Sequence, residues 1–282
     1  MQKLKFLIIA PRFHTNLYYR AKALQDAGHQ VKVLALYEGK SEFTNGISFQ
    51  KIGLSRFSQT AVWLLSGCRK KPLMSGLQLR LLSPNSDLRK NLKTYRPDVI
   101  ILKAYQNLLA LKTLIINKNA KVLMLTQTDK THIKGSRFLF RLNIRLFRQL
   151  GVHAYLTPIK SNYDAFKSFG INNVYYSPFV YPRQNKTLKT KTNDPIKIIS
   201  VGKYVKRKDQ KTLILACEKL IKEKKLIIDL YGEKADENYY RELQKLIAKN
   251  KLQKNIHLHT NIKYDALQKI YENYAIFVLP SY

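Results

Sequence analysis

The sequence predicts an α/β protein of two domains, each built on a parallel sheet. The first observation is the pattern of strand, helix and strand over residues 5–10, 17–27 and 30–36, because strands joined through a helix pair in parallel. The second is the return of this pattern from residue 196 onward. The third is segment 181–195, which is polar, lacks periodicity and holds two prolines, as linkers do.

The length and composition of the chain agree with this division. A chain of 282 residues has room for two α/β domains with separate cores. We expect a first domain over residues 1–183, a linker over 184–195 and a second domain over 196–282. A hydrophobic content of 45% favours a folded protein over a disordered one. No apolar run has the length of a transmembrane helix, and Met1 leads into the first strand without a signal-peptide pattern, so we expect a cytoplasmic protein.

The individual elements follow from apolar spacing and from helix stop signals. Gly28 ends the first helix, since a glycine readily takes the left-handed conformation found just beyond a helix. Apolar runs predict the further strands of the first domain at 99–102, 121–125, 154–157 and 174–177. In the second domain we expect a strand at 197–201, a loop at 202–209, a helix at 210–222 and a strand at 226–231.

The last 28 residues, 255–282, again predict strand, helix and strand, at 256–259, 264–273 and 275–279. The run 275–279 is wholly apolar and is typical of a buried strand. Pro280 and Ser281 follow it, at the end of a parallel strand where open α/β sheets bind ligands. Because the sequence stops just beyond these two residues, we expect the second domain to be incomplete.

Three stretches of the second half carry a resemblance to a known family. They are 199–209 (ISVGKYVKRKD), 230–233 (LYGE) with the helix and strand that follow, and 267–281 (LQKIYENYAIFVLPS). In order and spacing they resemble the retaining glycosyltransferases of family 4 (group 1), truncated at the C-terminus. The first half is similar more loosely, through 11–36 and 155–171. The resemblance implies the GT-B fold, with two Rossmann-like domains.

The resemblance also implies an activity, the transfer of a sugar from a nucleoside diphosphate sugar to a glycolipid or polysaccharide acceptor. It points to surface-glycan biosynthesis such as that of lipopolysaccharide, with the nucleotide sugar as a substrate and no further cofactor. Fixed cations at the leaving diphosphate would stabilise the charge that develops there. The matching positions on the donor diphosphate side are Gly202, Lys203, Lys208, Gly232, Pro280 and Ser281. Two other interpretations stay open, a solvated basic loop over 203–208 and an ordinary turn at Gly232.

The first domain is expected to hold the acceptor, with His14 and Asn16 in its first loop. Gln127 and Asp129, after the strand 121–125, are the catalytic candidates near the anomeric carbon. After Pro280 and Ser281 the family continues with a glycine-rich helix start and paired glutamates that contact the donor sugar. The sequence lacks these, so we expect poor donor binding and little turnover.

No metal site is expected. Cys68 and Cys217 have no CxxC partner, and we expect both to be reduced. His257 and His259 alternate on one strand and share a face, but the sequence shows no acidic or Cys partner at metal spacing. We therefore expect hydrogen-bonded strand histidines.

The charge of the chain, +33 in total, implies an anionic partner. Residues 1–183 hold 30 Lys and Arg against 7 acids. Segment 55–71 combines apolar and basic side chains, and Arg137, Arg141, Arg145 and Arg148 recur on one face of a predicted helix, so both could lie at a membrane surface. An ordinary packed helix is the alternative for the second segment.

We therefore expect an enzyme associated peripherally with the inner face of the membrane. The alternative is a basic protein that binds nucleic acid or an anionic membrane without catalysis. Binding to nucleic acid is disfavoured, because the aromatic and basic residues follow no recognised nucleic-acid-binding pattern.

Overall fold

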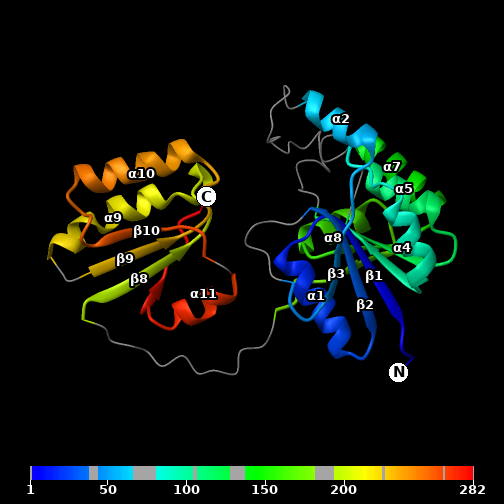
Figure 1. Ribbon diagram of the computed structural model, residues 1–282, viewed down its shortest axis with the longest axis horizontal. Helices are drawn as coiled ribbons and strands as arrows, with labels where there is room; N and C mark the ends of the chain where they lie inside the picture. Colours follow the sequence, from blue (N-terminus) through cyan, green and yellow to red (C-terminus); the bar gives the residue numbers. More distant parts are fainter. Residues whose placement is uncertain are drawn as a thin grey trace. The chain divides into compact units, whose positions relative to one another are not determined.

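The computed structural model describes residues 2–37, 44–65, 81–103, 107–127, 137–181, 194–223, 226–262 and 264–281. The chain divides into two compact units, Met1–Arg183 and Gln184–Tyr282. Each unit contains one sheet of parallel strands with helices packed on it (Figure 1). The predicted α/β fold is confirmed, while most of the predicted linker, 184–195, lies outside the described residues.

The first unit has a seven-stranded sheet with the order β3-β2-β1-β4-β5-β6-β7, and all its strand pairs are parallel. Its strands are β1 (Lys5–Arg12), β2 (Gln30–Tyr37), β3 (Ser48–Lys51), β4 (Val99–Leu102), β5 (Lys121–Leu125), β6 (Val152–Thr157) and β7 (Val174–Tyr176). The strand order reverses direction between β1 and β4, which is the topology of a doubly wound sheet.

Alternation along β1 divides the core of the first unit between the two faces of the sheet. Leu7 and Ile9 belong to one apolar cluster, and Phe6 and Ile8 belong to the other. Helix α1 (Thr15–Asp26) covers the second cluster with its buried residues Leu17 and Ala21. The helices that contribute to the first cluster are α2 (Arg56–Leu65), α4 (Asp87–Tyr95), α5 (Leu108–Ile116), α7 (Arg137–Gln149) and α8 (Lys160–Ser168).

The second unit has a four-stranded parallel sheet with the order β10-β9-β8-β11. Its strands are β8 (Ile196–Val201), β9 (Leu226–Tyr231), β10 (Ile256–His259) and β11 (Ile276–Phe277). Helices α9 (Gln210–Glu223) and α10 (Glu237–Lys249) pack on one face, and α11 (Tyr264–Tyr271) lies on the other (Figure 1). Because parallel crossovers are right-handed, the return from β10 to β11 on the far side of β8 requires this change of face.

The prediction that the strand at 275–279 is buried is wrong. A short strand is present there, β11, and it pairs with β8 alone at the edge of the sheet. Ile276, Phe277 and Leu279 are 46%, 51% and 50% exposed. An edge strand has a neighbour on one side only, so an apolar sequence does not by itself bury its side chains.

The two segments proposed for a membrane surface are both helical where they are described. The side chains of α7 divide between the core, where Ile144 and Phe147 are buried, and the surface, where Leu142 and Leu146 are exposed. Helix α7 is therefore a packed helix, as the alternative interpretation held. Among the described residues, no helix combines the length and the apolar character needed to cross a bilayer.

Candidate functional site

The carboxyl edge of the second sheet gathers the loops that the sequence singled out. Gly202 follows β8, Gly232 follows β9, and Ser281 comes shortly after β11. Since parallel strands end at the same edge, these loops meet there. The Gly202 amide donates to the carbonyl oxygen of Tyr231 at 2.9 Å, and the Gly232 amide donates to that of His259 at 3.0 Å.

The backbones of Gly202 and Gly232 lie in close contact. A Cβ atom on Gly232 would come within 2.1 Å of the carbonyl oxygen of Gly202, so no side chain fits at position 232. A Cβ atom on Gly202 would meet the side chain of Lys208 at 3.5 Å, which is ordinary contact. Gly232 is therefore required for the close approach of the two loops, whatever they bind.

Tyr204 connects the loop after β8 to strands β9 and β10 and to the loop after β9. Its hydroxyl lies 2.5 Å from the carbonyl oxygen of Leu230 and 3.0 Å from that of His259, and the side chain is fully buried. Its amide donates to the carbonyl oxygen of Glu233 at 3.0 Å. Burial raises the pKa of the Tyr204 hydroxyl, which keeps it protonated as a donor.

Lys208 reaches the segment after β11. It ends the short 3₁₀ helix Lys206–Lys208, and its Nζ atom donates to the Ser281 hydroxyl oxygen at 3.2 Å. Gln210 fixes the loop after β8, because its side-chain amide donates to the carbonyl oxygens of Gly202 and Lys203 at 3.3 and 3.1 Å. The positive charge of Lys208 is thus held beside the ends of β8 and β11.

Lys203 is placed differently. Its Nζ atom forms an ion pair with a Glu233 carboxylate oxygen at 2.9 Å, and both side chains are nearly half exposed. The pair joins the loop after β8 to the loop after β9. Pro280 lies half-buried directly before Ser281. The structure therefore brings together Gly202, Lys203, Lys208, Gly232, Pro280 and Ser281 at one edge of the sheet.

In the first unit, two of the four predicted residues lie at the start of α1. His14 precedes the helix in an extended conformation, with φ of −140° and no side-chain capping bond. Asn16 lies in the first turn, and its buried Oδ1 atom has no hydrogen-bond partner within the described ranges. Gln127 is exposed two residues beyond β5. Asp129 lies outside the described residues, so the structure places only one of the catalytic candidates.

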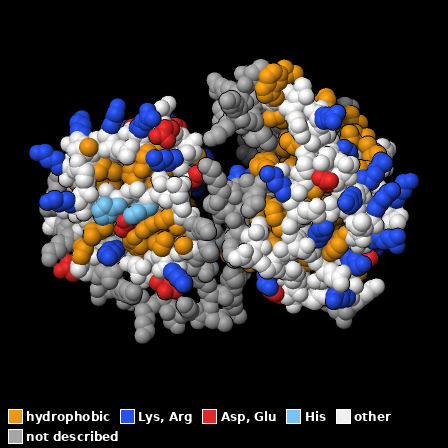
Figure 2. All heavy atoms as spheres, viewed as in Figure 1, with side chains coloured by type: hydrophobic (Ala, Val, Ile, Leu, Met, Phe, Trp, Pro, Cys, Tyr) orange, Lys and Arg blue, Asp and Glu red, His pale blue; other side chains and the backbone are white. Residues whose placement is uncertain are grey.

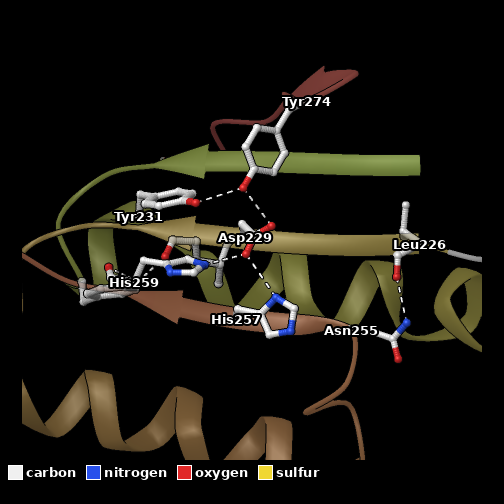
Figure 3. Close-up of polar contacts among 9 residues, drawn as sticks. Leu226, Asp229, Tyr231, Asn255, His257, His259 and Tyr274 are labelled. Carbon is white, nitrogen blue, oxygen red and sulfur yellow. Dashed lines mark hydrogen bonds and ion pairs between the residues drawn. The ribbon is translucent and has the colours of Figure 1, made fainter. Parts of the chain in front are cut away.

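His257 and His259 are hydrogen-bonded strand histidines, as expected, and they share an acidic partner that the spacing in the sequence did not show. Both imidazoles contact the carboxylate of Asp229, which comes from the neighbouring strand β9 (Figure 3). A signal for this cluster was present, because Asp229 stands between the core residues Ile228 and Leu230 and must point to the opposite face. The same alternation in β10 turns both histidines to that face.

The comparisons with known proteins concern the second unit and the fold. The sequence model of the family described as Glycosyl transferases group 1 matches residues 183–282. No curated protein matches the chain significantly.

Three solved structures resemble the chain at low sequence identity. A glycosyltransferase from Rickettsia africae ESF-5 has a TM-score of 0.61 at 12% identity, and the alignment covers 100% of this chain and 74% of the glycosyltransferase chain. Alr3699/HepE from Anabaena, solved with UDP-glucose, has a TM-score of 0.62 at 13% identity over 99% of this chain and 74% of its own. The lipopolysaccharide outer core galactosyltransferase WaaB has a TM-score of 0.56 at 12% identity, with the same two coverages. The chain therefore has the GT-B fold, and residues 183–282 carry the sequence features of the group 1 glycosyl transferases.

Proposed function

We propose that this protein is a retaining glycosyltransferase of family 4, which moves a sugar from a nucleoside diphosphate sugar to a glycolipid or polysaccharide acceptor. The match of residues 183–282 to the group 1 family supports the transfer reaction. The similarity to Alr3699/HepE, which was solved with UDP-glucose, makes a uridine diphosphate sugar the first donor to test. The similarity to a lipopolysaccharide galactosyltransferase supports a surface-glycan acceptor.

The observation that carries this proposal is the position of Lys208. Its Nζ atom lies 3.2 Å from the Ser281 hydroxyl oxygen, and its side chain runs along Gly202, which has no side chain of its own. A cation and a hydroxyl at the carboxyl end of parallel strands are groups that bind a diphosphate.

In the proposed reaction, Lys208 and Lys203 act on the leaving group. When the bond between the sugar and the diphosphate breaks, negative charge grows on the leaving phosphate. A fixed ammonium group stabilises that charge more in the transition state than in the ground state. Lys203 is paired with Glu233 in this structure, so its contribution requires that the diphosphate compete with this carboxylate.

The remaining site residues stay part of the proposal. His14 and Asn16 would contact the acceptor, and the buried Oδ1 atom of Asn16 is an acceptor of hydrogen bonds. Gln127 and Asp129 would lie near the anomeric carbon.

We also propose an association with the anionic inner face of the membrane. Phe57, Trp63 and Leu64 of α2 are 63%, 49% and 59% exposed. Apolar side chains at a helix surface, in a chain of net charge +33, are typical of adsorption to anionic lipid. A basic membrane- or nucleic-acid-binding protein without catalysis remains the alternative.

Nucleotide binding by the 282-residue chain tests the proposal. Because donor binding by this chain is expected to be weak, we expect UDP and UDP-glucose to raise the midpoint of thermal unfolding at high ligand concentration, since a ligand that binds only the folded state stabilises it. Lys208→Ala should weaken binding about 10-fold or more, as expected for loss of a charge-assisted contact. Lys206→Ala is the matched control, because Lys206 lies on the same 3₁₀ helix and is exposed.

If no uridine, guanosine or adenosine diphosphate stabilises the chain, the assignment of the donor site is wrong. The alternative, a basic membrane- or nucleic-acid-binding protein without catalysis, is then favoured. Equal losses in Lys206→Ala and Lys208→Ala would point to a general effect of charge. Release of UDP in the presence of candidate acceptors then tests turnover.

A further inference from the structure

A carboxylate and two imidazoles converge on the face of the second sheet that α9 and α10 leave uncovered. His257 stands directly opposite Asp229 in the register of β9 and β10, and His259 lies two residues further along. One carboxylate oxygen of Asp229, Oδ1, lies 3.1 Å from His257 Nδ1 and 2.5 Å from His259 Nε2. The three potential ligand atoms all lie within 4.8 Å of one another (Figure 3).

A second layer of contacts orients these groups. The Tyr274 hydroxyl donates to the other carboxylate oxygen of Asp229, Oδ2, at 2.9 Å. The hydroxyls of Tyr231 and Tyr274 lie 2.9 Å apart, and the ring of Tyr231 stacks on His259 at 4.3 Å with an interplanar angle of 11°. Metal-binding carboxylates and imidazoles in proteins are held in this way by hydrogen bonds and packing behind them.

The cluster is also accessible from solvent. The side chain of Asp229 is only 11% exposed, whereas those of His257 and His259 are 41% and 36% exposed. The carboxylate is thus the buried part of the cluster and the imidazoles are its exposed part. Figure 2 shows histidine side chains at the surface of the second unit. An ion could enter without any rearrangement of the backbone.

From this geometry we propose that Asp229, His257 and His259 bind a divalent transition-metal ion of the Zn²⁺ type. Zinc takes imidazole nitrogen and carboxylate oxygen at about 2.0–2.2 Å, so neighbouring ligand atoms in a tetrahedral site lie about 3.3 Å apart. The 3.1 Å separation of Asp229 and His257 is already close to this value, and His259 must withdraw by less than about 1 Å. Two imidazoles select Zn²⁺, Co²⁺, Ni²⁺ or Cu²⁺ over Mg²⁺ and Ca²⁺, which prefer oxygen ligands.

The ion would link β9 to the edge strand β10. The carbonyl oxygen of His259 accepts the hydrogen bonds of Gly232 and Tyr204, so a fixed His259 would stiffen the loop after β9. The metal site is separate in place from the proposed donor site, because its ligands lie on the face of the sheet and the donor residues lie at its edge. Its role is to stabilise the second unit.

Metal titration of the untagged chain, after treatment with a chelator, tests the site. We expect one Zn²⁺ per chain in competition with a chromophoric chelator, no comparable binding of Mg²⁺, and a visible absorption band with Co²⁺ typical of four-coordinate geometry. Asp229→Asn and His257→Gln should each weaken Zn²⁺ binding at least 100-fold. Tyr274→Phe should weaken it by about 10- to 100-fold, as expected for loss of a contact behind a ligand.

His153→Gln is the matched control, since His153 is an exposed histidine on β6 of the first unit, and this variant should keep the full stoichiometry and affinity. Circular dichroism establishes whether each variant is folded. If a variant of a metal ligand does not fold, Tyr274→Phe provides the test instead, because it changes no residue of β9 or β10. Weak binding in the millimolar range, or equal binding by wild type, Asp229→Asn and Tyr274→Phe, would overturn the proposal. The cluster would then be a hydrogen-bonded triad without a metal.

Discussion

Gly232 and Gly202 face each other so closely that a methyl group on Gly232 would lie 2.1 Å from the carbonyl oxygen of Gly202. The contact joins the loop after β9 to the loop after β8, and these loops carry Glu233 and Lys203. It is backbone against backbone, so neither partner can yield by rotating a side chain.

We predict that Gly232→Ala destabilises the second unit while Gly202→Ala does not. Overpacking typically costs about 1–3 kcal/mol. In a domain of this size, each 1 kcal/mol lowers the unfolding midpoint by about 4–8 °C. At Gly202 the atoms nearest to the new methyl group would belong to the Lys208 side chain, at an ordinary distance of 3.5 Å. Thermal unfolding of both variants, followed by circular dichroism, measures the difference, and equal midpoints would contradict the observed contact.

A second prediction concerns alkaline pH and Tyr95 in the first unit. Burial, with a smaller contribution from the charge of Asp98, raises the pKa of Tyr95 from 10.0 to about 12, and its hydroxyl donates to the carbonyl oxygen of Phe6 at 3.3 Å. The folded state therefore holds the proton more tightly than the unfolded state. The resulting stability is fully present below pH 10 and is lost as the pH rises from 10 to about 12.

Urea unfolding of wild type and Tyr95→Phe between pH 8 and pH 11.5 measures this effect. The stability advantage of wild type over the variant should shrink above pH 10, because phenylalanine has no proton to lose. Tyr175→Phe, at a tyrosine that is 59% exposed, is the control for the loss of a phenolic hydroxyl. A difference between wild type and Tyr95→Phe that stays constant with pH would refute the assignment.

A third prediction concerns the exposed apolar side chains of α2. Trp63 is the single tryptophan of the chain, so its fluorescence reports directly on this helix. We expect its emission to shift to shorter wavelength with vesicles containing anionic lipid and to change little with purely zwitterionic vesicles. Phe57→Ala should weaken binding several-fold, because a large apolar side chain no longer enters the interface.

Ile115→Ala is the control for this measurement. Ile115 is also apolar and is 65% exposed, but it lies on α5. Equal losses for Phe57→Ala and Ile115→Ala would mean that α2 is not the surface that contacts lipid.

The positions of most strands could be predicted from the sequence. Strands β4, β5 and β9 have the bounds that their mainly apolar runs predicted, because such runs are typical of buried parallel strands and stand out from the helices around them. Strand β10 has the bounds that its alternating pattern predicted. The position of Pro280 and Ser281 at the carboxyl edge of the second sheet also followed, since parallel strands end at the same edge.

The exposed state of β11 could not be predicted in this way. Its apolar run resembles those of β8 and β9, yet it lies at the edge of the sheet with a single neighbour. Burial depends on what packs against a strand, and this is a property of the whole sheet.

The sequence by itself thus determined the α/β class and the strand positions, because these follow from local periodicity and spacing. The glycines and lysines of the second unit's loops were indicated by the resemblance to the glycosyltransferase family. Only the tertiary structure decided that Asp229 meets His257 and His259, and that Lys208 reaches Ser281. These partners lie 28, 30 and 73 residues apart in the chain. Their contact depends on strand order and register, which are set by the packing of helices on the sheet and by the right-handed crossovers between strands.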